Sequence, residues 1–269
     1  MTSLLNYPRA KWGMAKEIVS LMPPHRSYLE PFFGSGAVLF NKTPSAIETI
    51  NDIDGQVVNF FRVCQKQPEK LSEALAMTPY ARDVFNDAHA DLGTTPLDQA
   101  IRFAVRSKMG HGFKTHTQTG FKIDVYARER SYCVDCWNRM PKHIIEAAER
   151  LKSVQIENRP ALEVIQKFNH DNVLIYADPP YLPETRTGGR MYRHEMTEQD
   201  HIELLEALIQ HKGPVILSGY ASDMYDYTLR KWDRIERKSY NQKSDPRTEV
   251  IWCNFQVAPS LFDYMDTEV

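Results

Sequence analysis

The sequence lacks the features that mark membrane proteins, secreted proteins and uniformly basic nucleic-acid binders. No apolar run approaches the roughly 18 residues of a membrane span, and no charged-then-apolar leader is present, so we expect neither a span nor secretion. A formal net charge of −2 argues against a generic polyanion binder. With 269 residues, the chain is long enough for one large domain or for a core domain with an insertion. We therefore expect a cytoplasmic globular protein.

Cysteine is also scarce, and its spacing predicts neither a disulfide framework nor a complete metal site. The four cysteines are Cys64, Cys133, Cys136 and Cys253. Cys133 and Cys136 have the spacing of half a zinc site, but no second close pair completes it. A buried or surface thiol pair is the favoured interpretation, and we predict no structural metal.

A short apolar run at residues 173–177 ends abruptly in Asp178-Pro179-Pro180-Tyr181. The run is too short for a helix and rich in β-prone residues, which predicts a strand buried on both faces. Proline cannot donate to a strand ladder, so pairing should stop at Pro179. Asp178 and Tyr181 should therefore lie at the carboxyl end of a strand, where open α/β sheets bind ligands. A rigid loop with a solvated Asp178 is the alternative.

A second candidate site begins at Phe32-Phe33-Gly34-Ser35-Gly36, which we interpret as a strand that enters a glycine turn and then a helix. Glycines let the backbone approach a ligand closely, and a following helix would present free N–H groups. Residues 46–50 predict a second strand, which is followed directly by Asp52 and Asp54. An acid there can accept hydrogen bonds from both hydroxyls of a ribose. We favour Asp52, because Asp54 can instead cap the next helix.

The segment between these two sites is locally basic. Residues 101–143 contain nine Lys and Arg against three acids, within a chain that is acidic elsewhere. Phosphate contacts need charge on only one face, although a solvated helical surface is the alternative. We predict an inserted domain at 63–143, with a loop or hairpin at 109–121, between core segments 1–62 and 144–269.

The remaining chain predicts further core elements. A helix at 144–151, a strand at 154–157 and a helix that begins at Pro160 should precede the Asp178 strand. Residues 184–192 should form a mobile loop beside the site. Thr197 to Asp200 resembles a helix-capping signal, and 214–219 predicts a buried strand. Residues 234–240 and 249–255 predict an antiparallel hairpin at the sheet edge.

Taken together, these motifs resemble the Dam-type, alpha-group family of DNA adenine-N6 methyltransferases. Asp178-Pro-Pro-Tyr181 resembles the catalytic motif of amino-group methyltransferases that use S-adenosyl-L-methionine, and Glu30-Pro-Phe-Phe-Gly-Ser-Gly36 resembles the cofactor loop. Tyr7-Pro-Arg-Ala-Lys11 is similar to the N-terminal cofactor motif, with Arg9 and Ala10 where the family has glycines. Asp52 and Leu217-Ser-Gly-Tyr220 match later motifs. The order of cofactor motif, recognition insert and catalytic motif is that of the alpha group.

The resemblance implies an α/β fold: a Rossmann-like, mostly parallel, seven-stranded methyltransferase sheet with an inserted, mainly helical DNA-recognition domain. It implies methyl transfer from S-adenosyl-L-methionine to the N6 amine of an adenine flipped out of duplex DNA. The implied catalytic residues are Asp178, Pro179 and Tyr181. The implied cofactor-binding residues are Tyr7, Lys11, Glu30, Pro31, Phe32, Gly34, Ser35, Gly36, Asp52, Ile53 and Asp178. The candidate DNA-binding residues are Arg102, Lys108, Lys114, His116 and Lys122.

The implied partner is double-stranded DNA, with a cognate restriction endonuclease as a further candidate and a monomer or weak dimer as the expected assembly. The resemblance implies a protein encoded by a bacterium or a phage, which associates with the nucleoid by binding DNA. Two alternatives stay open. One is an enzyme of the same Asp-Pro-Pro-Tyr chemistry that acts on RNA or protein glutamine. The other is a non-catalytic DNA-binding descendant, against which the intact Asp178 and Tyr181 speak.

Overall fold

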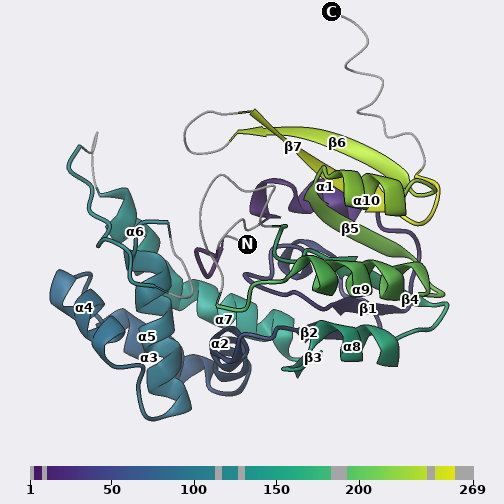
Figure 1. The fold of residues 1–269 in the computed structure, drawn as a ribbon. Helices are drawn as coiled ribbons and strands as arrows, with labels where there is room; N and C mark the ends of the chain where they lie inside the picture. The colour runs from purple at the N-terminus through teal and green to yellow at the C-terminus, as the bar shows by residue number, and fades with distance from the viewer. Residues whose placement is uncertain are drawn as a thin grey trace, which may run out of the picture.

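A seven-stranded sheet forms the centre of the protein (Figure 1). The computed structural model describes residues 3–7, 11–112, 117–126, 131–182, 193–240 and 246–257, with backbone alone for 238–240, 246 and 247. The strand order is β3-β2-β1-β4-β5-β7-β6. The strands are β1 (Ser27–Glu30), β2 (Ile47–Asn51), β3 (Val154–Glu157), β4 (Val173–Ala177), β5 (Val215–Tyr220), β6 (Asp233–Tyr240) and β7 (Pro246–Cys253). Strands β1 to β5 pair in parallel, whereas β7 is antiparallel to both β5 and β6. The predicted fold class and edge hairpin are confirmed.

Helices surround the sheet and extend beyond one end of it. They are α1 (Ala15–Ser20), α2 (Gly55–Lys66), α3 (Pro68–Met77), α4 (Arg82–Ala90), α5 (Pro96–Met109), α6 (Tyr132–Asn138), α7 (Met140–Leu151), α8 (Ala161–Lys167), α9 (Glu198–Ile209) and α10 (Asp223–Thr228), with the 3-10 turns η1 (Lys11–Gly13) and η2 (Leu39–Asn41). In the described part of the chain, no helix is long and apolar enough to cross a membrane.

Alternating side chains of the strands supply two hydrophobic layers. Ile175 of β4 and Leu217 of β5 pack with α8 and α9 on one face. Tyr176 and Ile216 lie one position away along the same strands, and they pack with α1, α2 and α7 on the other face of the sheet. This alternation follows from the two-residue period of a strand, and it covers both faces of the central strands. The prediction of strands buried on both faces is confirmed.

The helices α3 to α6 stand beside the sheet, with α2 and α7 at the junction (Figure 1). Leu71 of α3 and Phe103 of α5 belong to the same apolar cluster as Phe61 of α2 and Ile50 of β2. The helical segment therefore shares its hydrophobic core with the sheet. The predicted domain limits at 62 and 144 remain a prediction.

Local signals account for several element boundaries. Thr197 caps α9, and its side chain and that of Asp200 form the reciprocal capping box that the sequence predicts. The segment 109–121, predicted as a loop or hairpin, is closed at its base by an antiparallel bridge between Gly110 and Phe121. Residues 113–116 and the predicted loop at 184–192 lie outside the described residues.

Candidate active site

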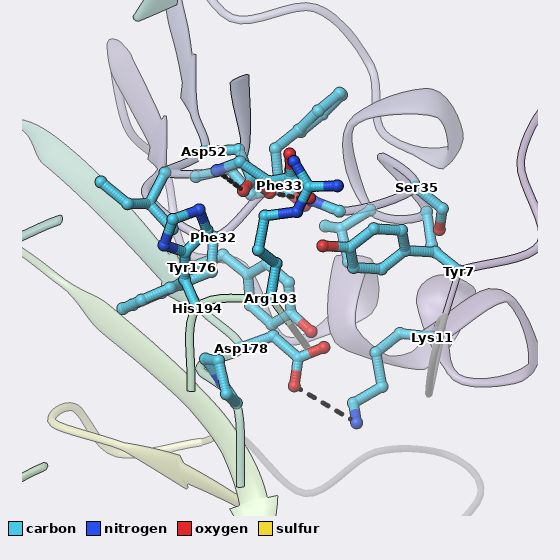
Figure 2. A pocket seen from close by; sticks show the side chains of 17 residues that line it. Tyr7, Lys11, Phe32, Phe33, Ser35, Asp52, Tyr176, Asp178, Arg193 and His194 are labelled. Atoms are coloured by element: carbon cyan, nitrogen blue, oxygen red, sulfur yellow. Dashed lines mark hydrogen bonds and ion pairs between the residues drawn. The ribbon is translucent and has the colours of Figure 1, made fainter. Parts of the chain in front are cut away.

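The candidate active site lies where the chain direction across the sheet reverses. From β1 the chain proceeds outward to β2 and β3, and it then returns to β4 on the other side of β1. Neighbouring parallel strands that continue in opposite directions leave a crevice at their carboxyl ends, where α/β proteins bind ligands. Glu30 ends β1 at this edge, Asp52 follows β2 and Asp178 follows β4. Figure 2 shows Asp52 at one end of the pocket and Asp178 beside Lys11 at the other.

The loop after β1 has the close backbone approach that its glycines predict. Gly34 and Gly36 adopt φ angles of +51° and +70°, the left-handed region that favours glycine. An added Cβ on Gly34 would lie 2.9 Å from the Tyr7 ring, and one on Gly36 would lie 2.4 Å from Phe33. Both positions therefore require glycine on grounds of space as well as backbone conformation.

The predicted helix after this loop is wrong. Only the three-residue 3-10 turn η2 follows. The helical conformation ends at Lys42, whose backbone is extended and whose ammonium is paired with the buried carboxylate of Glu48 at 2.6 Å. The loop is therefore not followed by a helix terminus, and its Phe33, Gly34 and Gly36 N–H groups are bonded within the protein.

Asp52 and Asp54 follow the end of β2, and their side chains accept different hydrogen bonds. The Asp52 carboxylate accepts hydrogen bonds from the N–H groups of Gly34 at 2.8 Å and Asp54 at 2.9 Å. Burial raises the pKa of Asp52 to about 7, although these hydrogen bonds act to lower it. Asp54 caps α2 by accepting from the Gln56 N–H at 2.9 Å. The capping alternative for Asp54 is thus confirmed.

Glu30 is a buried acid at the base of the pocket. It accepts a hydrogen bond from the Tyr28 hydroxyl at 2.8 Å. Burial, with the nearby charge of Asp178, raises the pKa of Glu30 to about 8, against a lowering by the Tyr28 hydrogen bond. At neutral pH the pocket therefore contains two carboxyl groups, Glu30 and Asp52, that titrate within the physiological range.

Asp178 is held through one of its two oxygens. Oδ1 accepts from the Ser218 hydroxyl at 2.8 Å and from the Tyr181 hydroxyl at 3.3 Å, and it lies 3.3 Å from the Lys11 ammonium. Within the described residues, no side chain bonds to Oδ2. Burial raises the pKa of Asp178 above its usual range, while Lys11 and Ser218 lower it and Glu249 raises it.

Lys11 and Tyr181 complete the surroundings of Asp178. The Lys11 ammonium contacts the Tyr181 hydroxyl and lies 4.6 Å from the centroid of that ring. It also lies 3.5 Å from Glu249 of β7. The Tyr181 side chain is buried, and its ring meets Tyr220 edge-on at 4.6 Å between centroids. In this arrangement the Tyr181 ring does not present a bare face, so its base-stacking role stays a prediction.

Most predicted site residues line one pocket. The lining residues are Tyr7, Lys11, Glu30, Phe32, Phe33, Gly34, Ser35, Ala37, Val38, Asp52, Ile53, Asp54, Tyr176, Asp178, Pro180, Arg193 and His194. Pro31, Gly36, Pro179 and Tyr181 adjoin these residues in the chain without lining it. Sequence reasoning missed Arg193 and His194 as lining residues, and Ser218 and Glu249 as neighbours of Asp178. Only Ser218 carried a signal, because it falls within a strand motif.

The candidate DNA-binding residues divide into three groups. Arg102 is engaged within the helical segment, where it pairs with Asp98 at 3.0 Å and donates to the Asp87 carbonyl at 2.9 Å. These contacts favour a structural role for Arg102. The Lys108 ammonium donates to the Ser3 carbonyl at 2.7 Å, and burial lowers the pKa of Lys108 to about 8. Lys122 lies over the Tyr132 ring at 5.8 Å. Lys114 and His116 lie outside the described residues.

A second hollow lies between the N-terminal segment and α5 to α7. It is lined by Ser3, Asn6, Trp12, Lys108, Lys122, Tyr132, Cys133, Cys136, Trp137, Arg139 and His143. Its lining includes the cations Lys108, Lys122 and Arg139 and the rings of Trp12, Tyr132 and Trp137, and the neighbouring Ile123, Val125 and Tyr126 are exposed. All four cysteines are free thiols. The described residues contain no group of three or more potential metal-ligating side chains, and the absence of a structural metal stays a prediction.

The geometry defines a Rossmann-like enzyme core with a charged pocket at its switch point, and comparison with known proteins names its family. A family model described as D12 class N6 adenine-specific DNA methyltransferase matches residues 7–242. The chain belongs to this family, whose activity is methylation of adenine in DNA.

Individual relatives are similar over most of their length. The "Type II methyltransferase M1.LlaDCHI" of Lactococcus lactis subsp. cremoris is 25% identical over 92% of this chain and 95% of its own. The "DNA adenine methylase" of Salmonella typhi is 20% identical over 87% of this chain and 85% of its own. The solved structure titled "Putative methyltransferase yhhF from Escherichia coli" covers 91% of this chain and 82% of that chain at 11% identity, with a TM-score of 0.37.

Proposed function

We propose that this enzyme transfers the methyl group of S-adenosyl-L-methionine to the N6 amine of an adenine held at Asp178. The observation that supports the proposal is that the two carboxylate oxygens of Asp178 differ in their hydrogen bonding. Oδ1 is fixed by Ser218, Tyr181 and Lys11, whereas no described side chain bonds to Oδ2. An ionised carboxylate has acceptor capacity on both oxygens. Oδ2 is thus available to accept an N–H of the target amine while its partner oxygen keeps the group in place.

The exocyclic amine of adenine needs such an acceptor because its lone pair is delocalised into the ring. Asp178 Oδ2 and the Pro179 carbonyl would each accept one N–H, which favours a pyramidal nitrogen with its lone pair directed at the methyl group. Pro179 and Pro180 stiffen this acceptor pair, because their rings fix the backbone φ angle.

The pocket suits S-adenosyl-L-methionine, which supplies an electrophilic methyl group on a positively charged sulfur. Gly34 and Gly36 adopt a left-handed backbone and pack against the rings of Tyr7 and Phe33, which shapes the loop that lines the pocket. Asp52 provides carboxylate oxygens for a ribose, and Phe32 and Ile53 supply apolar surface. We assign cofactor binding to these residues together with Tyr7, Glu30 and Ser35. Lys11 is assigned to the Asp178 end of the same pocket.

We propose the hollow beside α5 to α7 as a DNA-binding face. Lys108, Lys122 and Arg139 offer positive charge there, and Tyr132 is exposed beside Lys122. Phosphate contacts need such cations, and an exposed ring can contact bases or sugars. Flipping the adenine would then require opening of the Tyr181 surroundings, since that ring is covered in this structure.

The family assignment supports DNA over RNA or protein glutamine as the substrate, and the intact Asp178 network supports an enzyme over a non-catalytic descendant. A DNA substrate would place the enzyme on bacterial or phage DNA in the cytoplasm. A restriction endonuclease partner stays a prediction, because one relative is named a type II methyltransferase and another a DNA adenine methylase.

The test is to incubate the purified protein with methyl-labelled S-adenosyl-L-methionine and duplex DNA, structured RNA or a glutamine-containing peptide. We expect label on duplex DNA alone, and N6-methyladenine after digestion to nucleosides. Label on RNA or peptide, or on cytosine, would overturn the proposal. An absence of label with every substrate would support the non-catalytic descendant.

A further inference from the structure

Glu249 lies on the opposite side of Lys11 from Asp178. The Lys11 ammonium is 3.3 Å from Asp178 Oδ1 and 3.5 Å from Glu249 Oε2, with the Lys11 side chain only 4% exposed. Glu249 belongs to β7, more than 70 residues after Asp178 in the chain, and it pairs directly with Tyr220 of β5. One buried cation therefore separates two carboxylates that come from different strands.

The surroundings of Glu249 do not resemble those of an ordinary structural ion pair. Arg237 faces it directly across the β6–β7 ladder, but the Arg237 guanidinium bonds Glu17 of α1. Lys11 is the cation paired with Glu249 among the residues that the structure describes. Glu249 Oε2 is buried and accepts no hydrogen bond there. A buried carboxylate oxygen in this state is costly, so a role beyond packing is expected.

We propose that Glu249 is a positioning residue for methyl transfer, which holds Lys11 between two carboxylates and keeps the cluster around Asp178 negatively charged. This inference rests on the proposed function. With Lys11 and Asp178 alone, the cluster would be neutral. With Glu249 ionised it carries one net negative charge.

The charge matters because the reaction moves positive charge toward Asp178. The amine nitrogen of adenine forms a bond to the methyl carbon while the carbon–sulfur bond breaks, and that electron pair stays on sulfur. The nitrogen becomes positive and then releases one N–H proton to the Asp178 carboxylate or to water. A preorganised negative cluster stabilises the charge as it develops on nitrogen. It also keeps Asp178 basic enough to accept the proton.

The direction of the effect on Asp178 follows from the groups that face it. These are Lys11 of η1, Glu30 of β1, Tyr176 of β4, Tyr181, Ser218 of β5, Tyr225 of α10 and Glu249 of β7. Burial is the largest cause that raises the pKa of Asp178, and the Glu249 charge raises it further against Lys11 and Ser218. Without that charge, Lys11 pairs with Asp178 alone and the pKa of Asp178 falls.

The decisive variant is Glu249→Gln, which removes the charge and keeps the shape. Glu236→Gln is the matched control, since Glu236 lies on the neighbouring strand β6 and pairs with Arg234 at the surface. In the enzyme without ligands, the carboxyl carbon of Asp178 is titrated by 13C NMR and assigned by its loss in Asp178→Ala. We expect its midpoint to fall in Glu249→Gln, because the Glu249 charge raises the pKa of Asp178. Glu236→Gln should match the wild type.

Single-turnover methylation provides the second readout. We expect Glu249→Gln to slow methyl transfer by about tenfold and to move its acid limb to lower pH, with the Kd for S-adenosyl-L-methionine within about twofold of wild type. Glu249→Asp keeps the charge and should recover most of the rate. An unchanged Asp178 midpoint, or a rate loss matched by equal losses of cofactor affinity, would overturn the inference.

Three further outcomes are distinguished. If Glu249→Gln does not fold, Glu249→Ala takes its place with the same two readouts and the same expected directions, and an unchanged Asp178 midpoint in that variant contradicts the inference. A wild-type protein that methylates no adenine in duplex DNA refutes the proposed function itself. A wild type that methylates, beside an equally active Glu249→Gln with an unshifted acid limb, refutes only the role of Glu249.

Discussion

Ionisation of Asp52 should control the affinity for S-adenosyl-L-methionine. Burial raises the pKa of Asp52 to about 7, so the side chain is partly protonated in the free enzyme at neutral pH. Ribose hydroxyls donate more strongly to the charged carboxylate than to the acid. Affinity should therefore increase as the pH rises through this pKa, and decrease as it falls.

The magnitude follows from the ionised fraction. With a pKa of about 7, that fraction rises from roughly one tenth near pH 6 to nine tenths near pH 8, so Kd should fall by about tenfold over this interval. Asp52→Asn cannot ionise. It should weaken binding at pH 8 by about 1.5–3 kcal/mol, or roughly ten- to a hundredfold, and should remove the step near pH 7.

Isothermal titration calorimetry at constant ionic strength measures both effects. Glu30→Gln is the control, because burial raises the pKa of Glu30 to about 8 and its titration overlaps that of Asp52. The step near pH 7 should persist in Glu30→Gln. Wild-type affinity and pH dependence in Asp52→Asn would refute the assignment, and losses in Asp54→Asn instead would move the ribose contact to Asp54.

Three further predictions concern stability and DNA binding. Glu48→Ala should lower the free energy of unfolding by about 3–5 kcal/mol in urea titrations, because it leaves the buried Lys42 and the half-buried Arg150 without their carboxylate partner. A loss below about 1 kcal/mol would contradict the prediction. Asp52 and Glu30 have folded-state pKa values raised above their unfolded values of about 4, so the stability they contribute is fully present below that pH and is lost as the pH rises from there through about 7 and 8. The melting temperature of the ligand-free enzyme should fall across this interval and level off above it, with a smaller fall in the Asp52→Asn, Glu30→Gln double variant. Replacement of Lys122 and Arg139 by Ala should reduce the log–log slope of DNA affinity against salt concentration by about two. The control is the double variant Lys142→Ala, Lys152→Ala, at exposed positions on and just after α7, which should leave the slope unchanged. Equal effects of the two double variants would place the DNA elsewhere.

The sequence predicted those parts of the fold and site that local patterns encode. The apolar runs before Asp52 and Asp178 are too short for helices, and each is followed by polar or proline residues that end a strand. These strand ends could therefore be located without tertiary information. The glycines of the loop likewise mark a backbone conformation that other residues adopt poorly.

The remaining site depends on tertiary arrangement. Ser218 reaches Asp178 because β5 pairs with β4. Glu249 lies beside Lys11 because β7 inserts between β5 and β6, a strand order that the spacing of a hairpin does not specify. Arg102 was a candidate for phosphate contact on charge alone, but the fold brings Asp91 and Asp98 to it. Charge counts along a segment do not reveal which cations are already paired.

The role of Asp178 is tested by the rate of methyl transfer in Asp178→Ala, with rate and cofactor affinity measured on the same folded protein. Asp178 is proposed to accept a hydrogen bond from the amine of adenine and not to bind the cofactor. We predict that the single-turnover rate on duplex DNA falls by about 10²–10⁴-fold or more, while the Kd for S-adenosyl-L-methionine stays within a few-fold of wild type. Substantial N6-methyladenine formation by the folded variant, or a loss explained entirely by cofactor affinity, would contradict the account.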